Sequence, residues 1–75
     1  MHEVDARGMS CPLPLLKAKK ALNGMAAGER LRVLSTDAGS VRDFRVFCEQ
    51  SGNLLLESGE SEGVYVYVLQ KRGAQ

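Results

Sequence analysis

Cys11 is the residue of this sequence best placed to do chemistry, because it directly precedes Pro12-Leu13-Pro14 at the start of an apolar, lysine-bearing helical pattern. Proline is favoured in the first turn of a helix, and Pro12 also restricts Cys11 to extended backbone, so we expect Cys11 to be the N-cap. A sulfur there lies near the positive end of the helix dipole, with the Leu13 and Leu15 amides as its closest donors. The sequence therefore predicts a thiol that ionises readily.

A free cysteine is more often a small buried hydrophobe, and the prolines by themselves need mark only the start of a helix. The residues that precede this cysteine argue for function. The segment 5–10 is polar and contains Gly8 as a turn signal, so Cys11 emerges from a loop between a strand and a helix. A loop position next to a helix terminus is typical of reactive cysteines.

Composition limits the class of protein. The 75 residues suffice for one domain, which we expect to span 1–75, and 44% hydrophobic with 25% charged residues is typical of a soluble globular chain. A net charge of +1 predicts no strong nucleic-acid binding, and we expect neither a secretion signal nor a membrane span. We expect a cytoplasmic protein with no direct membrane binding.

Two cysteines and one histidine without ligand spacing predict free thiols and no metal site.

The periodicity of apolar residues predicts six elements. Alternation and β-branched residues favour strands, whereas Gly24 and Gly52 follow two segments with helical spacing. The strands are expected at 2–6, 30–35, 54–57 and 63–69, and the helices at 12–23 and 40–50, with a turn at 58–62. This order, β-α-β-α-β-β, predicts an α+β fold: a two-layer α/β sandwich with a four-stranded mixed sheet and both helices on one face.

The same periodicity suggests which side chains face the helices. In the last strand the valines share one face and the tyrosines the other, and we expect the valines to point to the helices. The first helix is expected to bury Leu15, Leu16, Ala18 and Leu22, and the second Val41, Phe44, Phe47 and Cys48, with Asp37, Gly39 or Ser40 as its cap.

The run from Asp5 to Pro14, together with Thr36-Asp37, Arg42-Asp43-Phe44 and a closing Tyr65…Lys71-Arg72, resembles the TusA family, also called SirA-like or YedF-like. The resemblance spans nearly the whole chain and its Asp-x-x-Gly-x-x-Cys-Pro-x-Pro signature is specific. It implies the fold predicted above and a small cytoplasmic sulfur carrier that serves, for example, tRNA thiolation, cofactor sulfuration or sulfur oxidation.

Position by position, the resemblance implies that Cys11 carries sulfane sulfur as a persulfide, with Pro12, Pro14, Asp5 and Gly8 as supporting motif residues. No cofactor is needed beyond that covalent persulfide. The implied partners are a sulfur donor such as a cysteine desulfurase or a rhodanese and a downstream acceptor protein. Whether the chain is a non-enzymatic carrier or a sulfurtransferase-type relay protein stays open.

Other residues have two interpretations each. Arg7 is a candidate for stabilising a persulfide anion or simply a partner of Asp5. Asp37 and Asp43 are expected to cap and flank the second helix. Cys48 is expected in the core and the lysines at 17, 19 and 20 on a solvated face, with partner steering as the alternative.

Three alternative functions are kept. One is a regulatory or interaction module that docks through the face with Tyr65 and Tyr67 and through the basic helix, with Cys11 only structural. Cross-strand packing is the ordinary meaning of these tyrosines. Another is a thiol-redox protein that pairs Cys11 with Cys48, and the third is a carrier that delivers selenium.

Overall fold

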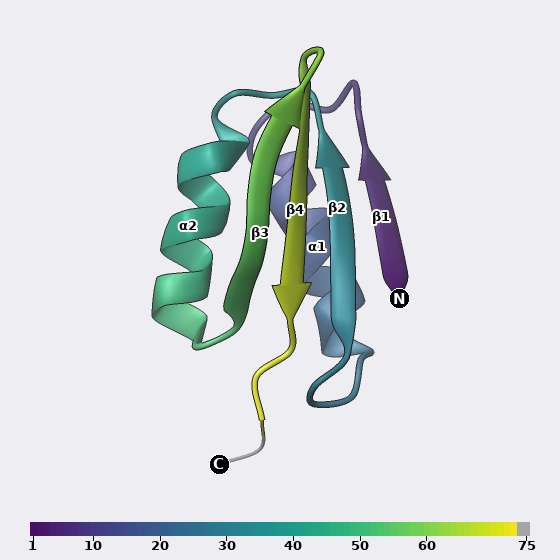
Figure 1. Cartoon of the computed structure of the whole chain (residues 1–75), viewed down its shortest axis with the longest axis vertical. Helices are drawn as coiled ribbons and strands as arrows, with labels where there is room; N and C mark the ends of the chain where they lie inside the picture. Colours follow the sequence, from purple (N-terminus) through teal and green to yellow (C-terminus); the bar gives the residue numbers. More distant parts are fainter. Residues whose placement is uncertain (74–75) are drawn as a thin grey trace.

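The computed structural model describes residues 1–73 and contains the six predicted elements in the predicted order (Figure 1). They are β1 (His2–Ala6), α1 (Leu13–Asn23), β2 (Arg30–Ser35), α2 (Ser40–Ser51), β3 (Leu54–Ser61) and β4 (Val64–Gln70). Neither helix in this part of the chain has the length and apolar character needed to cross a membrane.

The four strands form one mixed sheet in the order β1-β2-β4-β3. β1 and β2 are parallel, as expected for strands joined through a helix, while β4 runs antiparallel to both β2 and β3. Both helices cover the same face of this sheet, with α1 behind β2 and β4 in the view of Figure 1. The predicted two-layer α+β architecture is confirmed.

Five boundaries differ from the predictions. The end of α2 and both ends of β4 differ by a single residue, and the start of α1 and the end of β3 are the informative ones. α1 begins at Leu13, because Pro12 occupies its N-cap position and the Pro12 carbonyl accepts the bond from the Leu16 amide. The hairpin between β3 and β4 is longer than predicted, because most of the polar segment expected as a turn continues the ladder of β3. The chain reverses instead at Glu62 and Gly63, whose positive φ values of 51° and 80° suit a tight two-residue hairpin turn.

The prediction that the valines of β4 face the helices is wrong. Register pairs Tyr67 with Val33 and Leu69 with Leu31, and all four side chains belong to the core between sheet and helices. The Tyr67 ring stacks on Phe44 of α2 with a centroid separation of 4.7 Å and an interplanar angle of 22°. The stacked pair adds about 1 kcal/mol to ordinary burial, which favours the tyrosine face of β4 toward the helices.

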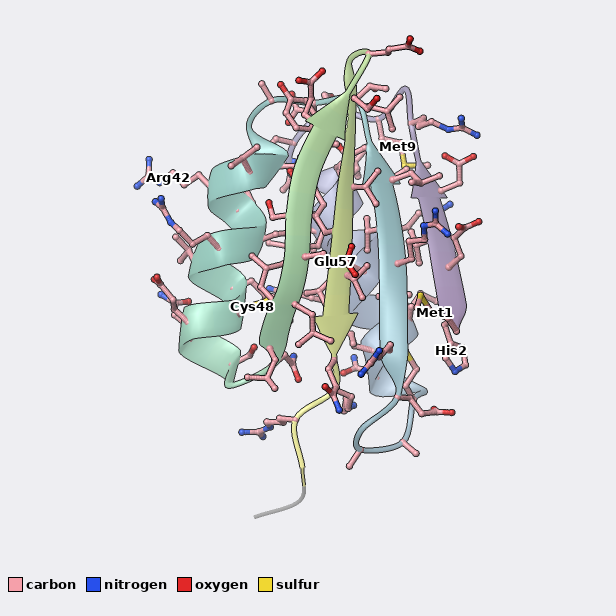
Figure 2. All side chains as sticks on the ribbon, viewed as in Figure 1. Met1, His2, Met9, Arg42, Cys48 and Glu57 are labelled. Atoms are coloured by element: carbon pink, nitrogen blue, oxygen red, sulfur yellow. The ribbon has the colours of Figure 1, made fainter. Side chains whose placement is uncertain are left out.

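The opposite face of the sheet has no covering layer and carries charged residues. Glu57 projects from it toward the viewer in Figure 2, and Arg32 lies 3.7 Å from Glu3 across the first two strands. Val66 is therefore only half-buried, although Val68 in the same strand is buried between its neighbours.

Each helix buries a narrower stripe than the sequence predicts. α1 buries Pro14, Ala18 and Leu22 and leaves Leu16 exposed. α2 buries Phe44 and Cys48 and leaves Val41 exposed, because each helix contacts a single layer and its outer flank has no neighbour.

Candidate functional site

Cys11 lies in the loop between β1 and α1, at the edge of the sheet where the two parallel strands end, and its thiol is free and exposed. The loop is ordered by backbone bonds from the Met9 amide to the Ala6 carbonyl, 3.2 Å, and from the Leu13 amide to the Ser10 carbonyl, 2.9 Å. Because the Leu13 amide is used inside the loop and Pro12 is the N-cap, Cys11 does not cap the helix. The prediction that Cys11 is the N-cap is wrong by one residue, since Pro12 occupies that position.

Gly8 attaches the motif loop to the end of β2. Its φ of +82° lies in the left-handed region, which only glycine adopts without strain, and its amide donates to the Thr36 hydroxyl at 2.9 Å. The glycine and the threonine are neighbours because parallel pairing places Ala6 beside Ser35. This contact brings the loop that follows β2 next to the loop that carries Cys11.

Arg7 pairs with Asp5, the second of its two sequence-based interpretations. The guanidinium donates from Nε and one Nη to the two carboxylate oxygens at 2.9 and 2.8 Å, and the Arg7 amide donates to the same carboxylate at 3.1 Å. These hydrogen bonds lower the pKa of Asp5 to about 2. Asp5 thus fixes the Arg7 side chain through local hydrogen bonds.

Asp37, in the loop after β2, and Asp43, in α2, both contact Cys11. The Cys11 amide donates to Asp37 Oδ2 at 3.2 Å, and the Cys11 thiol donates to Asp43 Oδ2 at 2.6 Å. The sequence predicts that these two aspartates cap and flank α2. Asp43 does lie in the first turn of α2, but the N-cap is Gly39, without a side-chain cap bond. Their appearance in the family-like pattern was the only signal that could have placed them at the thiol.

The electrostatic prediction for Cys11 is also wrong. Its pKa is raised, first by the hydrogen bond that its thiol donates to Asp43, then by desolvation and by the negative charges of Asp43 and Asp37. The expected stabilisation by a helix dipole does not outweigh two carboxylates in contact. The fold therefore exposes the Cys11 thiol and at the same time makes it a weaker acid.

Gly39 is a site residue that sequence reasoning did not identify beyond a possible cap. A Cβ at this position would lie 3.1 Å from Asp37 Oδ2 and 3.7 Å from Cys11 Cβ. A side chain there would displace the Asp37 carboxylate. Glycine therefore allows the two loops to approach each other at the thiol.

Ser40 and Tyr67 support Asp37 from the core. The Ser40 hydroxyl donates to the Asp37 carbonyl at 2.7 Å and lies 2.7 Å from the Tyr67 hydroxyl, with both side chains buried. Tyr67 is therefore a core residue and not part of an exposed docking patch, while Tyr65 is half-buried against the same core. Through Ser40, Tyr67 thus connects the hydrophobic core to the loop beside Cys11.

Cys48 lies in the core, as predicted, between α2 and the sheet (Figure 2). Burial raises the pKa of its thiol to about 11. Both cysteines are free, one exposed and one buried. The predicted solvated face of α1 is present, with Lys17, Lys19 and Lys20 exposed. Within residues 1–73, no group of three or more His, Cys, Asp or Glu side chains is gathered as metal ligands would be.

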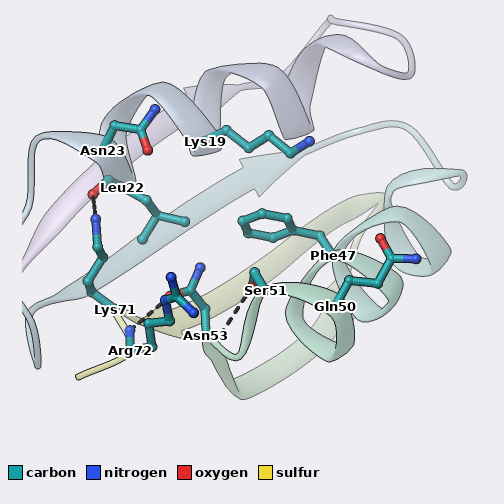
Figure 3. Close-up of a pocket in the computed structure, with 9 residues that line it drawn as sticks. All are labelled: Lys19, Leu22, Asn23, Phe47, Gln50, Ser51, Asn53, Lys71 and Arg72. Carbon is teal, nitrogen blue, oxygen red and sulfur yellow. Dashed lines mark hydrogen bonds between the residues drawn. The ribbon is translucent and has the colours of Figure 1, made fainter. Parts of the chain in front are cut away.

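A groove of about 420 Å³ opens between the C-terminal halves of the two helices (Figure 3). Its floor includes Leu22 and Phe47 and its rim includes Lys19 and Lys71. Lys71 Nζ donates to the Leu22 carbonyl at the end of α1, where a cation is favoured by the helix dipole. This groove does not include the motif loop.

Comparisons with known proteins agree with the motif and the fold. Residues 2–71 match the family model described as Sulfurtransferase TusA. The chain is 51% identical over 70 residues to the sulfur carrier protein TusA of Allochromatium vinosum, covering 93% of this chain and 92% of that protein. It is 48% identical over 69 residues to a putative sulfur carrier protein of Neisseria meningitidis serogroup A, covering 92% and 93%.

A solved structure extends the agreement to three dimensions. The crystal structure of a SirA-like protein from Desulfitobacterium hafniense superposes with a TM-score of 0.85 at 31% identity, covering 96% of this chain and 99% of that one. The family match, over residues 2–71, includes the loop that bears Cys11. The chain belongs to the TusA family of sulfur carriers.

Proposed function

We propose that Cys11 is the residue that carries the sulfur, as a persulfide taken from a donor protein and passed to an acceptor protein. The observation that supports this most directly is the state of the two cysteines, since Cys11 is exposed in an ordered motif loop and Cys48 is buried in the core. A persulfide on Cys11 adds its outer sulfur to an already exposed atom, so a partner can reach it without opening the fold.

The donor class follows from the chemistry of the transfer. Cys11 needs sulfur that is already at the sulfane level, and a cysteine persulfide on a cysteine desulfurase or a rhodanese supplies it without a further oxidant. The acceptor is a second protein thiol or a modification enzyme. Because an exposed free thiol persists only under reducing conditions, we place this exchange in the cytoplasm.

The test is an intact-mass measurement. The protein is incubated with a cysteine desulfurase and L-cysteine, or with a rhodanese and thiosulfate, and then weighed under non-reducing conditions. We expect a gain of about 32 Da that reducing agent removes, corresponding to one added sulfur. Cys11→Ala should show no gain and Cys48→Ala, the matched control, should show the full gain.

Two results would contradict the assignment. Retention of the added mass in folded Cys11→Ala would move the site elsewhere, and failure of the wild-type protein to gain sulfur from either donor would remove the carrier role of Cys11. A wild-type product lighter by two hydrogens and linked through Cys11 and Cys48 would support the thiol-redox alternative instead.

A further inference from the structure

The side chain that touches the Cys11 sulfur is a carboxylate, an unusual neighbour for a nucleophile. Asp43 Oδ2 lies 2.6 Å from Sγ and accepts its proton in a hydrogen bond, and the two residues are 32 positions apart in sequence. Asp43 lies in the first turn of α2 and is half-buried, so its carboxylate is held at this position by the helix. The contact is a product of the fold and not of local sequence.

The other charged groups around the motif loop leave this effect uncompensated. Asp37, from the loop after β2, adds a second negative charge and binds the Cys11 amide. Of the nearby cations, Arg7 in the motif loop is hydrogen-bonded to Asp5. Lys17 in α1 also lowers the pKa of Asp5. Consistent with this balance, the pKa of the Cys11 thiol is raised.

We propose that Asp43 is a positioning residue that raises the tendency of the carrier to give up its sulfur, because it stabilises the empty thiol and repels the loaded persulfide. The inference rests on the proposed role of Cys11. A hydropersulfide is a stronger acid than the parent thiol, so the outer sulfur of the loaded form carries negative charge at neutral pH. The loaded form also has no proton on Sγ for Asp43 to accept.

The transfer step shows where this bias acts. In loading, Cys11–SH reacts with a donor persulfide R–S–S⁻ to give Cys11–S–S⁻ and R–SH. The S–S bond of the donor breaks, a new S–S bond forms on Sγ, and the thiol proton moves from Cys11 to the donor sulfur. No net oxidation occurs. Asp43 favours the unloaded Cys11 thiol through its hydrogen bond and disfavours the loaded Cys11 persulfide through charge repulsion.

The variant that tests this proposal is Asp43→Asn, which keeps the shape of the side chain and removes its charge. Each protein is equilibrated with a fixed ratio of glutathione persulfide to glutathione at pH 7, and the loaded fraction is measured by intact mass. In parallel, the pH midpoint of Cys11 alkylation is measured with iodoacetamide. We expect the alkylation midpoint to fall and the loading constant to rise, by up to about tenfold for each pH unit of that fall.

Two matched controls separate the hydrogen bond from general charge. Asp37→Asn removes an equal charge that contacts the Cys11 amide and not its sulfur, so it should change both quantities less. Glu49→Gln removes a charge from the same helix, six residues and about 9 Å farther along its axis, and should leave both unchanged. Circular dichroism checks folding, and Asp43→Ser is the second variant if Asp43→Asn does not fold.

The outcomes are distinct. A lower alkylation midpoint with an unchanged or reduced loading constant in Asp43→Asn overturns this proposal and leaves the carrier role intact. An ordinary alkylation midpoint in the wild-type protein overturns the contact itself. If no wild-type protein gains sulfur from any donor, the proposed function fails, while the alkylation midpoints still report on Asp43.

Discussion

The hydrogen-bonded hydroxyls of Ser40 and Tyr67 give a prediction about the free energy of unfolding. Which of the two hydroxyls donates decides the cost of removing each one. Ser40 has one hydroxyl proton, and it is donated to the Asp37 carbonyl. Tyr67 must therefore be the donor in its contact with Ser40 Oγ, and burial keeps the pKa of Tyr67 above its usual value, so that proton is retained. Tyr67 is 0% exposed and Ser40 is 1% exposed, so water cannot replace a lost partner.

The two single substitutions should differ in cost. Tyr67→Phe removes a donor and leaves the Ser40 hydroxyl with its bond to Asp37, so we expect a loss of about 1 kcal/mol in the free energy of unfolding. Ser40→Ala leaves the Tyr67 hydroxyl buried without a partner and also removes the bond to the Asp37 carbonyl, so it should cost about 2 kcal/mol. The double variant should also cost about 2 kcal/mol, less than the sum, because it removes donor and acceptor together.

The assay is urea unfolding followed by circular dichroism for the wild-type protein, both single variants and the double variant. For a chain of this length, about 1 kcal/mol corresponds to a fall of roughly 4–8 °C in Tm, which gives an independent readout. Additive costs would refute the reasoning, since they would show that the two hydroxyls do not interact. A greater loss for Tyr67→Phe than for Ser40→Ala would contradict the assignment of donor and acceptor.

Two further predictions follow from the burial and charge of single groups. Iodoacetamide should label Cys11 and spare Cys48 in the folded protein, because burial raises the pKa of Cys48 to about 11; peptide mapping checks this, and labelled Cys48 without unfolding contradicts it. Arg7→Ala should return the pKa of Asp5 from about 2 toward 3.8, as measured by NMR titration of the carboxyl group. The pKa of Asp5 is lower in the folded protein than in the unfolded chain, so the Asp5–Arg7 pair stabilises the fold above pH 3.8. This contribution is lost as the pH falls through about 2. An Asp5 titration that Arg7→Ala leaves unchanged would refute the pairing.

The sequence predicted the order of elements because each is specified by local patterns. Alternating apolar residues gave the strands, Gly24 and Gly52 marked the ends of two helices, and the β-α-β order required a parallel pair with the helix on one side. Boundaries near 58–62 were missed because polar residues continue an exposed edge strand as readily as they form a turn.

The orientation of β4 could not be decided from its own sequence. Both faces of that strand are apolar, with valines on one side and Tyr65, Tyr67 and Leu69 on the other, so a period of two leaves the choice open. The structure settles it through groups from other elements. Phe44 supplies a ring for Tyr67 to stack on, and Ser40 supplies an acceptor for its hydroxyl, and both belong to α2.

The charge state of Cys11 was predicted wrongly for a related reason, since local reasoning saw a helix terminus and could not see α2. The dipole of a helix acts like half a charge within its first turn, and Cys11 lies one residue outside the N-cap Pro12. Against this stand two full carboxylate charges in hydrogen-bond contact, from residues 26 and 32 positions away. The larger and nearer charges determine the sign, so the same fold that exposes the thiol also raises its pKa.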